Sequence, residues 1–483
     1  MSSAIQGLKP EGLWHYFAEY CKIPPPSKHE EAAAKYIIDT ARSLGLEWAQ
    51  DATGNVVVRK PAWKGYENRP PICLQGHLDM VPEKRPTKKH DFLKDAITLV
   101  RKGNAMMADD TTLGADNGVA VATNLAIMAD KSLVHGPLEF LFTVDEETGL
   151  TGARELDPSL LKSQTLLNLD SEEEGALYVG CSGGRDTTGT WAIEGEAAPA
   201  GTVGLELKVG GLKGGHSGLE IDKGRGNAIK IMNRAILAVG EHGARLARFD
   251  AGNKRNAIPR DAVALVFIPK KKLDGALNAV EALNDTVRAE LASVEPALEV
   301  TATRFKGRGK VVKKSLQRKL TMAISAMPHG VIKMSADISG LVETSTNLAV
   351  ITTNKKDFVI QTSQRSSVAS EIGEITQTVK HVFELAGATV SGSDGYPGWK
   401  PNLASPILKN AVATYKQMYG KEPAVKAVHA GLECGIIGEK YPGMDMVSFG
   451  PTLEGVHSPD EKIFIDTVEK YWDFLLGILK NVK

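Results

Sequence analysis

The sequence predicts an α/β protein of two or three folding units, in which an α+β unit interrupts the first. Strand-like and helix-like segments alternate from residue 31 to residue 169, polar residues follow the ends of the predicted strands, and a new run of strand and helix patterns begins after Gly183. At 483 residues, the chain is also longer than one ordinary domain and long enough for two domains to bury a core each.

The first part of the chain alternates between helical and strand periodicity. Residues 27–30 (Ser-Lys-His-Glu) have the form of a capping box, and small and apolar residues then recur at helical spacing until Gly45, which predicts an amphipathic helix. Further along, the patterns predict strands at residues 55–59, 72–75, 138–144 and 165–169 and a helix at residues 119–128. An α/β sheet of this kind binds its ligands beyond the carboxyl ends of its strands.

The middle of the chain predicts an inserted α+β domain. Strands are expected at residues 205–209 and 263–268, and helices at residues 227–239 and 273–294. The polar strand ends of the first part resume only near His457. We therefore predict a first domain made of residues 1–184 and 393–483 around an inserted domain of residues 185–392.

Charge and composition favour a small-molecule substrate. The chain has 58 basic and 58 acidic residues, so its formal net charge is zero and no global field attracts it to nucleic acid or to an anionic membrane. Basic runs at residues 270–272 and 306–314 lack interleaved aromatic residues that could stack on bases, and we interpret them as solvated loops. We expect neither a nucleic acid nor a membrane as a partner.

The cysteines and the N-terminal residues indicate a reducing compartment. The four cysteines lie far apart without a C-x-x-C pair, which argues against a disulfide framework and against a thiolate zinc site. The first ten residues lack the basic and apolar regions of a signal peptide, and no apolar run approaches the roughly 18 residues of a membrane span. We expect a soluble, cytoplasmic protein.

Histidines and acids follow the predicted strands at five places. These are His77 with Asp79, Asp116 before the helix 119–128, the run Asp145-Glu146-Glu147, Asp170, and His457 in a Gly/Pro loop. Taken alone, His77 could be a structural histidine and Asp116 a helix cap. The run of three acids is different, because consecutive carboxylates after a buried strand repel one another unless a cation or a proton holds them. Together, the histidines and carboxylates suit Zn²⁺, Mn²⁺ or Co²⁺.

Six stretches along the whole chain resemble the M20 family of metallopeptidases, which includes glutamate carboxypeptidase and aminoacylase. The likeness is strongest to the aminoacyl-histidine (Xaa-His) dipeptidases of that family. The stretches are residues 74–81 (LQGHLDMV), 111–118 (TTLGADNG), 211–218 (GLKGGHSG), 255–260 (RNAIPR), 429–435 (HAGLECG) and 457–461 (HSPDE). The resemblance implies a zinc-peptidase-like catalytic domain, with a mixed sheet and helices on both faces, and an inserted lid domain that forms a homodimer.

The resemblance also implies a centre of two divalent metal ions, most simply Zn²⁺, with Co²⁺ or Mn²⁺ as alternatives. Asp116 would bridge the two ions. His77 and Asp170 would complete one site, and Glu147 and His457 the other.

Catalysis is implied for Glu146, Asp79 and His216. Glu146 would take the proton from a metal-bridging water that attacks the peptide bond, and Asp79 would orient the ring of His77. His216, in the lid, would donate to the oxyanion, which explains the surrounding glycines better than a phosphate-binding loop, whose G-x-x-x-x-G-K-[ST] pattern is absent.

Substrate binding is implied for Asn256, Arg365 and Gly431, with the first two on the substrate's C-terminal carboxylate. Arg365 also fits an ordinary strand surface. One departure from the family pattern is the pair Asp109 and Asp110, which adds negative charge before residues 111–118, and we expect it to affect metal affinity and substrate preference.

The implied function is hydrolysis of dipeptides, preferentially Xaa-His and including β-Ala-His. The same motifs fit a tripeptidase, an N-acyl amino acid deacylase, or a dimeric binding protein without turnover. Glu146 favours an enzyme, because a binding scaffold needs no proton acceptor beside a set of metal ligands.

Overall fold

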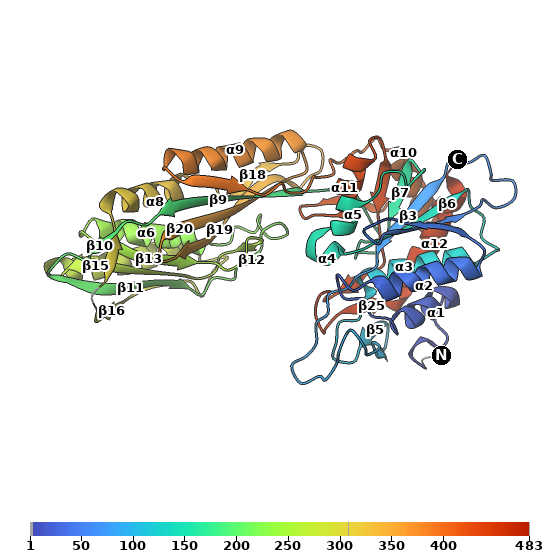
Figure 1. Cartoon of the computed structure of the whole chain (residues 1–483), viewed down its shortest axis with the longest axis horizontal. Helices are drawn as coiled ribbons and strands as arrows, with labels where there is room; N and C mark the ends of the chain where they lie inside the picture. The colour runs from blue at the N-terminus through green and yellow to red at the C-terminus, as the bar shows by residue number, and fades with distance from the viewer. Residues whose placement is uncertain (1–2, 308, 483) are drawn as a thin grey trace. The chain divides into compact units, whose positions relative to one another are not determined.

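The computed structural model describes residues 3–307 and 309–482, which form two compact units (Figure 1). The first unit comprises Met1–Gly180, Pro401–Ala427 and Leu432–Lys483, and the second comprises Cys181–Lys400 and Val428–Gly431. The domain boundaries after residues 184 and 392 remain predictions from the sequence.

An eight-stranded mixed sheet forms the centre of the first unit. In spatial order its strands are β1 (Glu47–Gln50), β2 (Val56–Lys60), β6 (Leu138–Thr143), β3 (Ile72–His77), β7 (Thr165–Asn168), β23 (Asp445–Ser448), β8 (Ala176–Cys181) and β22 (Ala424–Val428). β3 runs parallel to both of its neighbours, whereas β2 is antiparallel to β1 and to β6. Every residue of β3 and β6 is buried, as expected for parallel strands that are covered on both faces. The α/β prediction is therefore confirmed.

The predicted elements of this unit match the observed ones closely. The four predicted strands correspond to β2, β3, β6 and β7, with ends that differ by two residues or fewer. The predicted helix 119–128 lies within α3 (Ala115–Ala129), which begins earlier and includes Asp116. Asp116 and Asn117 have non-helical backbone angles, and the peptide bond between them is cis.

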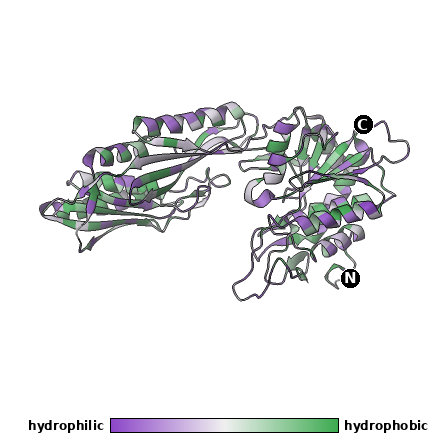
Figure 2. Cartoon of the chain, viewed as in Figure 1, coloured by the Kyte–Doolittle hydropathy of each residue, from purple (hydrophilic) through white to green (hydrophobic). Residues whose placement is uncertain are grey.

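The remaining helices of the first unit are η1 (Ser3–Ile5), α1 (Glu11–Tyr20), α2 (Glu31–Ser43), α4 (Glu146–Gly149), α5 (Thr151–Glu155), α10 (Pro406–Tyr419), α11 (Glu433–Lys440) and α12 (Ile465–Asn481). Figure 2 shows hydrophilic and hydrophobic residues alternating along α2, the predicted amphipathic helix. The predicted capping box is wrong. α2 has no side-chain cap, because the hydroxyl of Ser27 donates instead to Asp79 Oδ2 at 2.7 Å.

A small antiparallel sheet in the first unit brings two distant segments together. Its order is β24 (Leu453–Glu454), β25 (Lys462–Phe464), β5 (Ala105–Ala108) and β4 (Leu99–Lys102). The loop between β24 and β25 contains His457, and the chain that leaves β5 leads to Asp116. The pairing of β25 with β5 therefore holds the segment of Asp116 beside the loop of His457.

The second unit is built on a nine-stranded sheet whose pairings are all antiparallel. Its order is β16 (Glu299–Phe305), β11 (Thr202–Gly210), β15 (Ala262–Pro269), β13 (Arg245–Ala251), β19 (Val342–Thr353), β20 (Asp357–Ser366), β9 (Gly183–Ala192) and β21 (Thr389–Gly392), with β18 (Gly330–Met334) beside β19. The helices are α6 (Ala228–Gly240), α7 (Leu273–Glu290), α8 (Lys314–Ala326), α9 (Ala369–Leu385) and the 3-10 helix η2 (Lys270–Lys272). Two pairs of short strands complete it: β10 (Gly195–Ala197) with β17 (Lys310–Val312), and β12 (Gly215–His216) with β14 (Ala257–Ile258).

The predicted α+β elements of the middle segment are present. Predicted strands 205–209 and 263–268 lie within β11 and β15, and the predicted helices correspond to α6 and α7, although α7 ends at Glu290 rather than at residue 294. The interpretation of the basic runs as solvated loops is wrong in part: residues 270–272 form η2, and β17 lies within the run 306–314 with Val311 and Val312 buried. Residue 308 of that run lies outside the described residues.

Among residues 3–307 and 309–482, no helix combines the length and the apolar character needed to cross a membrane. All four cysteines are described and buried, and none forms a disulfide.

Candidate metal centre

Parallel strands of the first unit end at one edge of the sheet. His77, the last residue of β3, is in register with Thr143, the last residue of β6. Asn168 ends β7 in register with Gln75 of β3. The residues that follow these strands, including the predicted acids, therefore start from the same edge, where α/β sheets bind their ligands.

Asp116 lies between two histidines. Its Oδ1 atom is 3.1 Å from Nε2 of His77, and its Oδ2 atom is 3.1 Å from Nε2 of His457. His77 Nε2 is also 3.4 Å from Asp170 Oδ1, and His457 Nε2 is 3.0 Å from Glu147 Oε1. All five residues that the sequence predicts as ligands are thus brought together.

Two groups of three residues share Asp116. One is His77, Asp116 and Asp170, and the other is Asp116, Glu147 and His457; the candidate ligand atoms of each group lie within 4.8 Å of one another. Imidazole nitrogens and carboxylate oxygens are ligands that suit Zn²⁺, Co²⁺ and Mn²⁺, and a carboxylate with one oxygen in each group can bridge two ions. The residues present therefore fit a dinuclear centre.

The electrostatics of the cluster favour bound positive charge. Hydrogen bonds that Asp116 and Glu147 accept from the ring of His457 raise the pKa of this histidine to about 11. Burial alone lowers the pKa of His77, but Asp170 and the neighbouring carboxylates raise it well above its usual value. Burial raises the pKa of Asp170 to about 6. Buried carboxylates that hold protons on neighbouring imidazoles can bind divalent cations in their place.

Asp79 joins two parts of the cluster. Its Oδ1 atom accepts a hydrogen bond from the backbone N–H of Glu146 at 2.9 Å, and its Oδ2 atom accepts one from the N–H of Glu147 at 3.1 Å. Oδ1 also lies 3.3 Å from Nδ1 of His77. The same Nδ1 atom lies 3.0 Å from the backbone carbonyl of Asp79. Through its two bonds to the backbone, the Asp79 side chain holds the turn that carries both glutamates. Asp145, at the start of this turn, has a left-handed φ of 49°, which costs free energy in a residue other than glycine.

Glu146 lies beside the candidate ligands. Its carboxylate lies in a group with His77 and Glu147, with candidate ligand atoms within 4.8 Å of one another. Burial raises the pKa of Glu146 well above the usual value, and Asp170, Glu433 and Glu147 raise it further, opposed by His77.

Two residues that carry this geometry were not predicted. Asn117 Oδ1 accepts from the N–H of His77 at 3.1 Å, and its Nδ2 donates to the carbonyl of Leu169 at 2.9 Å, so that Asn117 connects the ends of β3 and β7. Glu461 accepts four backbone N–H groups of residues 113–116. Both residues stand within motifs of the sequence, but their partners lie up to hundreds of residues away, so spacing along the chain could not reveal them.

The extra negative charge of Asp109 and Asp110 is balanced by neighbouring basic residues. Lys88 Nζ lies 2.6 Å from Asp109 Oδ2, and Arg85 Nε lies 3.5 Å from Asp110 Oδ1. Arg85 also contacts Asp460, in the loop of His457, at 2.6 Å. Because these acids pair locally, their effect on the metal cluster is smaller than the sequence alone suggests.

His216 and Asn256 lie close together in the second unit. His216 pairs with Ala257 in the β12–β14 ladder, and the carbonyl of Asn256 accepts from the N–H of Ser217 at 2.8 Å. The Nδ1 atom of His216 accepts N–H groups of Gly218 at 3.2 Å and Leu219 at 3.1 Å. These two bonds place the proton of the neutral ring on Nε2, which is then a donor. Burial and the nearby Arg365 lower the pKa of His216, which favours this neutral form.

Arg365 is a buried cation without a carboxylate partner among the described residues. It is 7% exposed and its Nη1 donates to the hydroxyl of Tyr396 at 3.0 Å, while its Nε has no partner. Gly431 makes room for the same tyrosine, because a Cβ atom at residue 431 would lie 2.8 Å from Cε2 of Tyr396. A buried guanidinium of this kind provides a site for an anion. Tyr396 was not predicted from the sequence.

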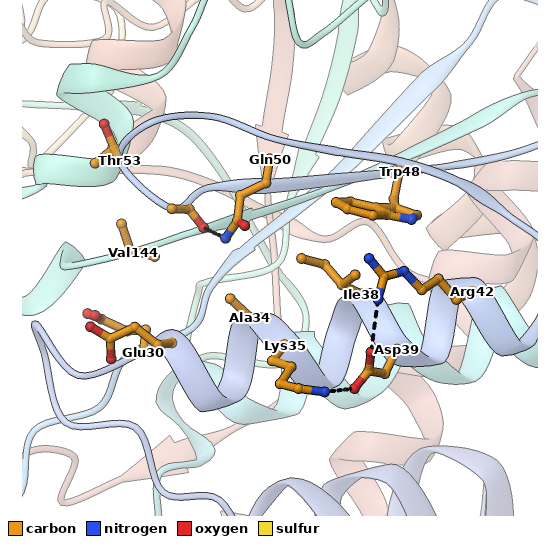
Figure 3. A pocket seen from close by; sticks show the side chains of 12 residues that line it. Glu30, Ala34, Lys35, Ile38, Asp39, Arg42, Trp48, Gln50, Thr53 and Val144 are labelled. Carbon is orange, nitrogen blue, oxygen red and sulfur yellow. Dashed lines mark hydrogen bonds and ion pairs between the residues drawn. The ribbon is translucent and has the colours of Figure 1, made fainter.

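A groove beside α2 and β1 is a weaker candidate (Figure 3). Asp39 pairs there with Lys35 and with Arg42, at 3.5 Å for the latter, and the guanidinium of Arg42 lies 4.8 Å from the ring centre of Trp48. Because these charged groups satisfy one another, the groove offers a ligand less than the carboxylate cluster does.

Comparisons with known proteins identify the group to which this geometry corresponds. Residues 73–481 match the model of peptidase family M20/M25/M40. The chain is 42% identical over 482 residues to the cytosol non-specific dipeptidase of Escherichia coli, covering 99% of each protein.

Solved structures agree with these matches. The crystal structure of the aminoacylhistidine dipeptidase from Vibrio alginolyticus has a TM-score of 0.92 at 42% identity, covering 100% of this chain and 98% of that one. The aminopeptidase PepT from Bacillus cereus has a TM-score of 0.57 at 18% identity, covering 98% and 99% of the two chains, and shares the fold.

Proposed function

We propose, on the premise that this chain belongs to the peptidase family M20/M25/M40, that it hydrolyses dipeptides. Family membership confirms the resemblance that the six motifs indicate. A preference for Xaa-His dipeptides, including β-Ala-His, is part of the proposal. It is supported by the likeness to a protein named aminoacylhistidine dipeptidase, whereas the Escherichia coli relative is named a non-specific dipeptidase.

One observation carries the proposal: the two oxygens of Asp116 face Nε2 of two different histidines, each at 3.1 Å. We propose that His77, Asp116 and Asp170 hold one divalent ion, and that Asp116, Glu147 and His457 hold the other, in the groups described above. Zn²⁺ suits these ligands best, with Co²⁺ and Mn²⁺ as alternatives.

Glu146 supplies the proton transfer in this proposal. Two divalent ions at these ligands supply Lewis acidity, which lowers the pKa of water and polarises the substrate carbonyl. Glu146 accepts the proton of the attacking water and delivers it to the nitrogen of the leaving amine, so that one water molecule is consumed for each peptide bond broken. Its raised pKa, caused first by burial, suits a group that must both accept and release a proton near neutral pH.

Residues of the second unit bind the substrate in this proposal. The Nε2–H of His216 donates to the developing oxyanion, in keeping with the tautomer that its Nδ1 contacts select. Arg365 binds the C-terminal carboxylate of the dipeptide, with help from Asn256, and Tyr396 orients its guanidinium. Gly431 contributes by admitting the ring of Tyr396.

We also propose a cytoplasmic homodimer that forms through residues 185–392. The Escherichia coli relative is named a cytosol enzyme. Ile332 and Met334 expose 46% and 44% of their surface on β18, which pairs only with β19 among the described residues. Light scattering should give the mass of a dimer, and Ile332→Lys should shift it to that of a monomer; a monomeric wild-type protein would contradict this part.

The direct test is hydrolysis of β-Ala-His, Gly-His and Gly-Leu by the purified protein with Zn²⁺, Mn²⁺ or Co²⁺. Glu146→Gln should lower kcat by about 10²- to 10⁴-fold, whereas Glu155→Gln, an exposed acid on α5, should not change it. If no dipeptide is cleaved with any metal, the proposed activity is wrong. Faster cleavage of Gly-Leu would contradict only the Xaa-His preference, and cleavage restricted to N-acetyl amino acids would favour a deacylase.

A further inference from the structure

Glu461 is a buried carboxylate at the N-terminus of α3. It is 2% exposed, and its two oxygens accept four backbone N–H groups: Oε2 from Leu113 at 2.7 Å and Gly114 at 3.0 Å, and Oε1 from Ala115 at 2.8 Å and Asp116 at 3.2 Å. The first turn of a helix leaves such N–H groups without partners, and a negative charge there is favoured by the helix dipole. The N-cap residue Gly114 has no side chain to do this, so Glu461 caps α3 from a distant part of the sequence.

The other end of this connection is the loop of His457. Within this loop the N–H of Glu461 donates to the carbonyl of Ser458 at 3.1 Å, and the hydroxyl of Ser458 donates to the carbonyl of Gly455 at 2.6 Å. His457 itself has a left-handed φ of 59°, a conformation that only surrounding contacts can hold in a residue other than glycine. The loop is therefore internally bonded, and Glu461 anchors it to the backbone of Asp116.

We propose that Glu461 is a positioning residue of the metal centre, which fixes the separation of Asp116 and His457. These two residues face each other at 3.1 Å between Oδ2 and Nε2, and they belong to the same group of candidate ligands. They come from segments about 340 residues apart in the sequence, and Glu461 bonds the backbone of one while standing four residues from the other. The ladder between β25 and β5 joins the two segments at residues 105–107 and 462–464, and Glu461 adds a link at the backbone of Asp116 itself.

A carboxylate suits this position better than an amide. Four donors converge on two oxygens, so each oxygen must accept two hydrogen bonds. In Glu461→Gln, one of these oxygens is replaced by an amide NH2 group, which is a donor that faces two N–H groups, and the loop or the start of α3 must shift. Outer groups that orient metal ligands typically contribute about 10- to 100-fold in metal affinity.

Glu139 provides a matched control. It is also a buried carboxylate of the first unit that accepts several donors: the N–H groups of Lys162 at 2.9 Å and Ser163 at 2.8 Å, and the hydroxyl of Ser163 at 2.6 Å. It stands at the start of β6, whereas Glu146 and Glu147 follow the end of that strand. Glu139→Gln should therefore destabilise the same unit without moving the cluster.

The test is a Co²⁺ titration of the metal-free, full-length protein, followed by visible absorption, together with thermal unfolding. Glu461→Gln should weaken one of the two Co²⁺ sites about 10- to 100-fold and change its absorption band, whereas Glu139→Gln should lower Tm and leave both sites unchanged. Glu461→Asp keeps the charge with a shorter side chain, and it should fold and give an intermediate loss of affinity.

Two outcomes would overturn the inference. In the first, Glu461→Gln lowers Tm, but both Co²⁺ affinities stay within twofold of wild type and the absorption spectra are unchanged. This result would assign Glu461 a purely structural role. The other, if Glu461→Gln does not fold, is wild-type Co²⁺ binding by Glu461→Asp. The inference rests on the proposed metal ligands, but Co²⁺ titration does not require peptidase activity. A wild-type protein that binds Co²⁺ without cleaving dipeptides would therefore count against the proposed function alone.

Discussion

Asp79→Asn should lower both metal affinity and kcat/KM, because Asp79 holds the backbone of the base and of one ligand at once. Its two oxygens accept the N–H groups of Glu146 at 2.9 Å and Glu147 at 3.1 Å. In Asp79→Asn, whichever way the carboxamide turns, its NH2 group faces one of these two N–H donors. One charge-assisted hydrogen bond is then lost, at about 1.5–3 kcal/mol, and this corresponds to roughly a 10- to 100-fold change.

The assay separates the two effects. Co²⁺ titration measures metal affinity, and kcat/KM for Gly-His is then measured at saturating metal. The activity should stay reduced there, because a displaced Glu146 is not restored by more metal. Ser27→Ala is the graded comparison. It removes only the 2.7 Å hydroxyl contact to Oδ2 and keeps both backbone bonds, so its loss should stay below about tenfold. An Asp79→Asn variant within twofold of wild type in both measurements would refute this reasoning.

Further predictions concern the second unit and the metal itself. Tyr396→Phe removes the hydroxyl that accepts from Arg365, and Gly431→Ala places a Cβ 2.8 Å from the ring of Tyr396. Each variant should raise KM for Gly-Leu about tenfold and keep kcat within twofold of wild type. An unchanged KM would count against the proposed carboxylate site. Burial, with Arg365, lowers the pKa of His429 from 6.5 to about 3, so below pH 6.5 the unfolded chain binds a proton that the folded chain does not. Stability should therefore fall as pH decreases from 6.5 towards 3, by about 2 kcal/mol at pH 5, and this part of the decrease should be missing in His429→Gln when unfolding is followed in urea. Removal of metal by a chelator should lower the free energy of unfolding by about 2.7 kcal/mol for each ion that is present at 100 times its Kd. An unchanged Tm would contradict the proposed metal centre.

The alternation of strands and helices could be read from the sequence because it depends on local periodicity. Buried strands such as β3 and β6 are rich in apolar residues, and their ends were predicted to within two residues. The acids after β6 stood out for the same local reason, since like charges in succession need a compensating cation. The six motifs then indicated the family and, through it, which of these residues are candidate ligands.

Contacts between distant segments could not be read in this way. Ser27 has the spacing of a capping residue, yet its hydroxyl bonds Asp79, because the fold brings a buried carboxylate closer than the helix end that it precedes. Asp109 and Asp110 looked like a source of repulsion, but the loop of Arg85 and Lys88 folds back to pair with them.

The residues that can bind metal could be named from the sequence, because several imidazoles and carboxylates that follow strand ends of one sheet are typical of a metal site. Which oxygen of Asp116 faces which histidine, the tautomer of His216, and the positions of Asn117, Tyr396 and Glu461 were decided only by the tertiary structure. The reason is that a hydrogen bond depends on distances of about 3 Å between atoms. For residues that are hundreds of positions apart in the sequence, only folding sets these distances.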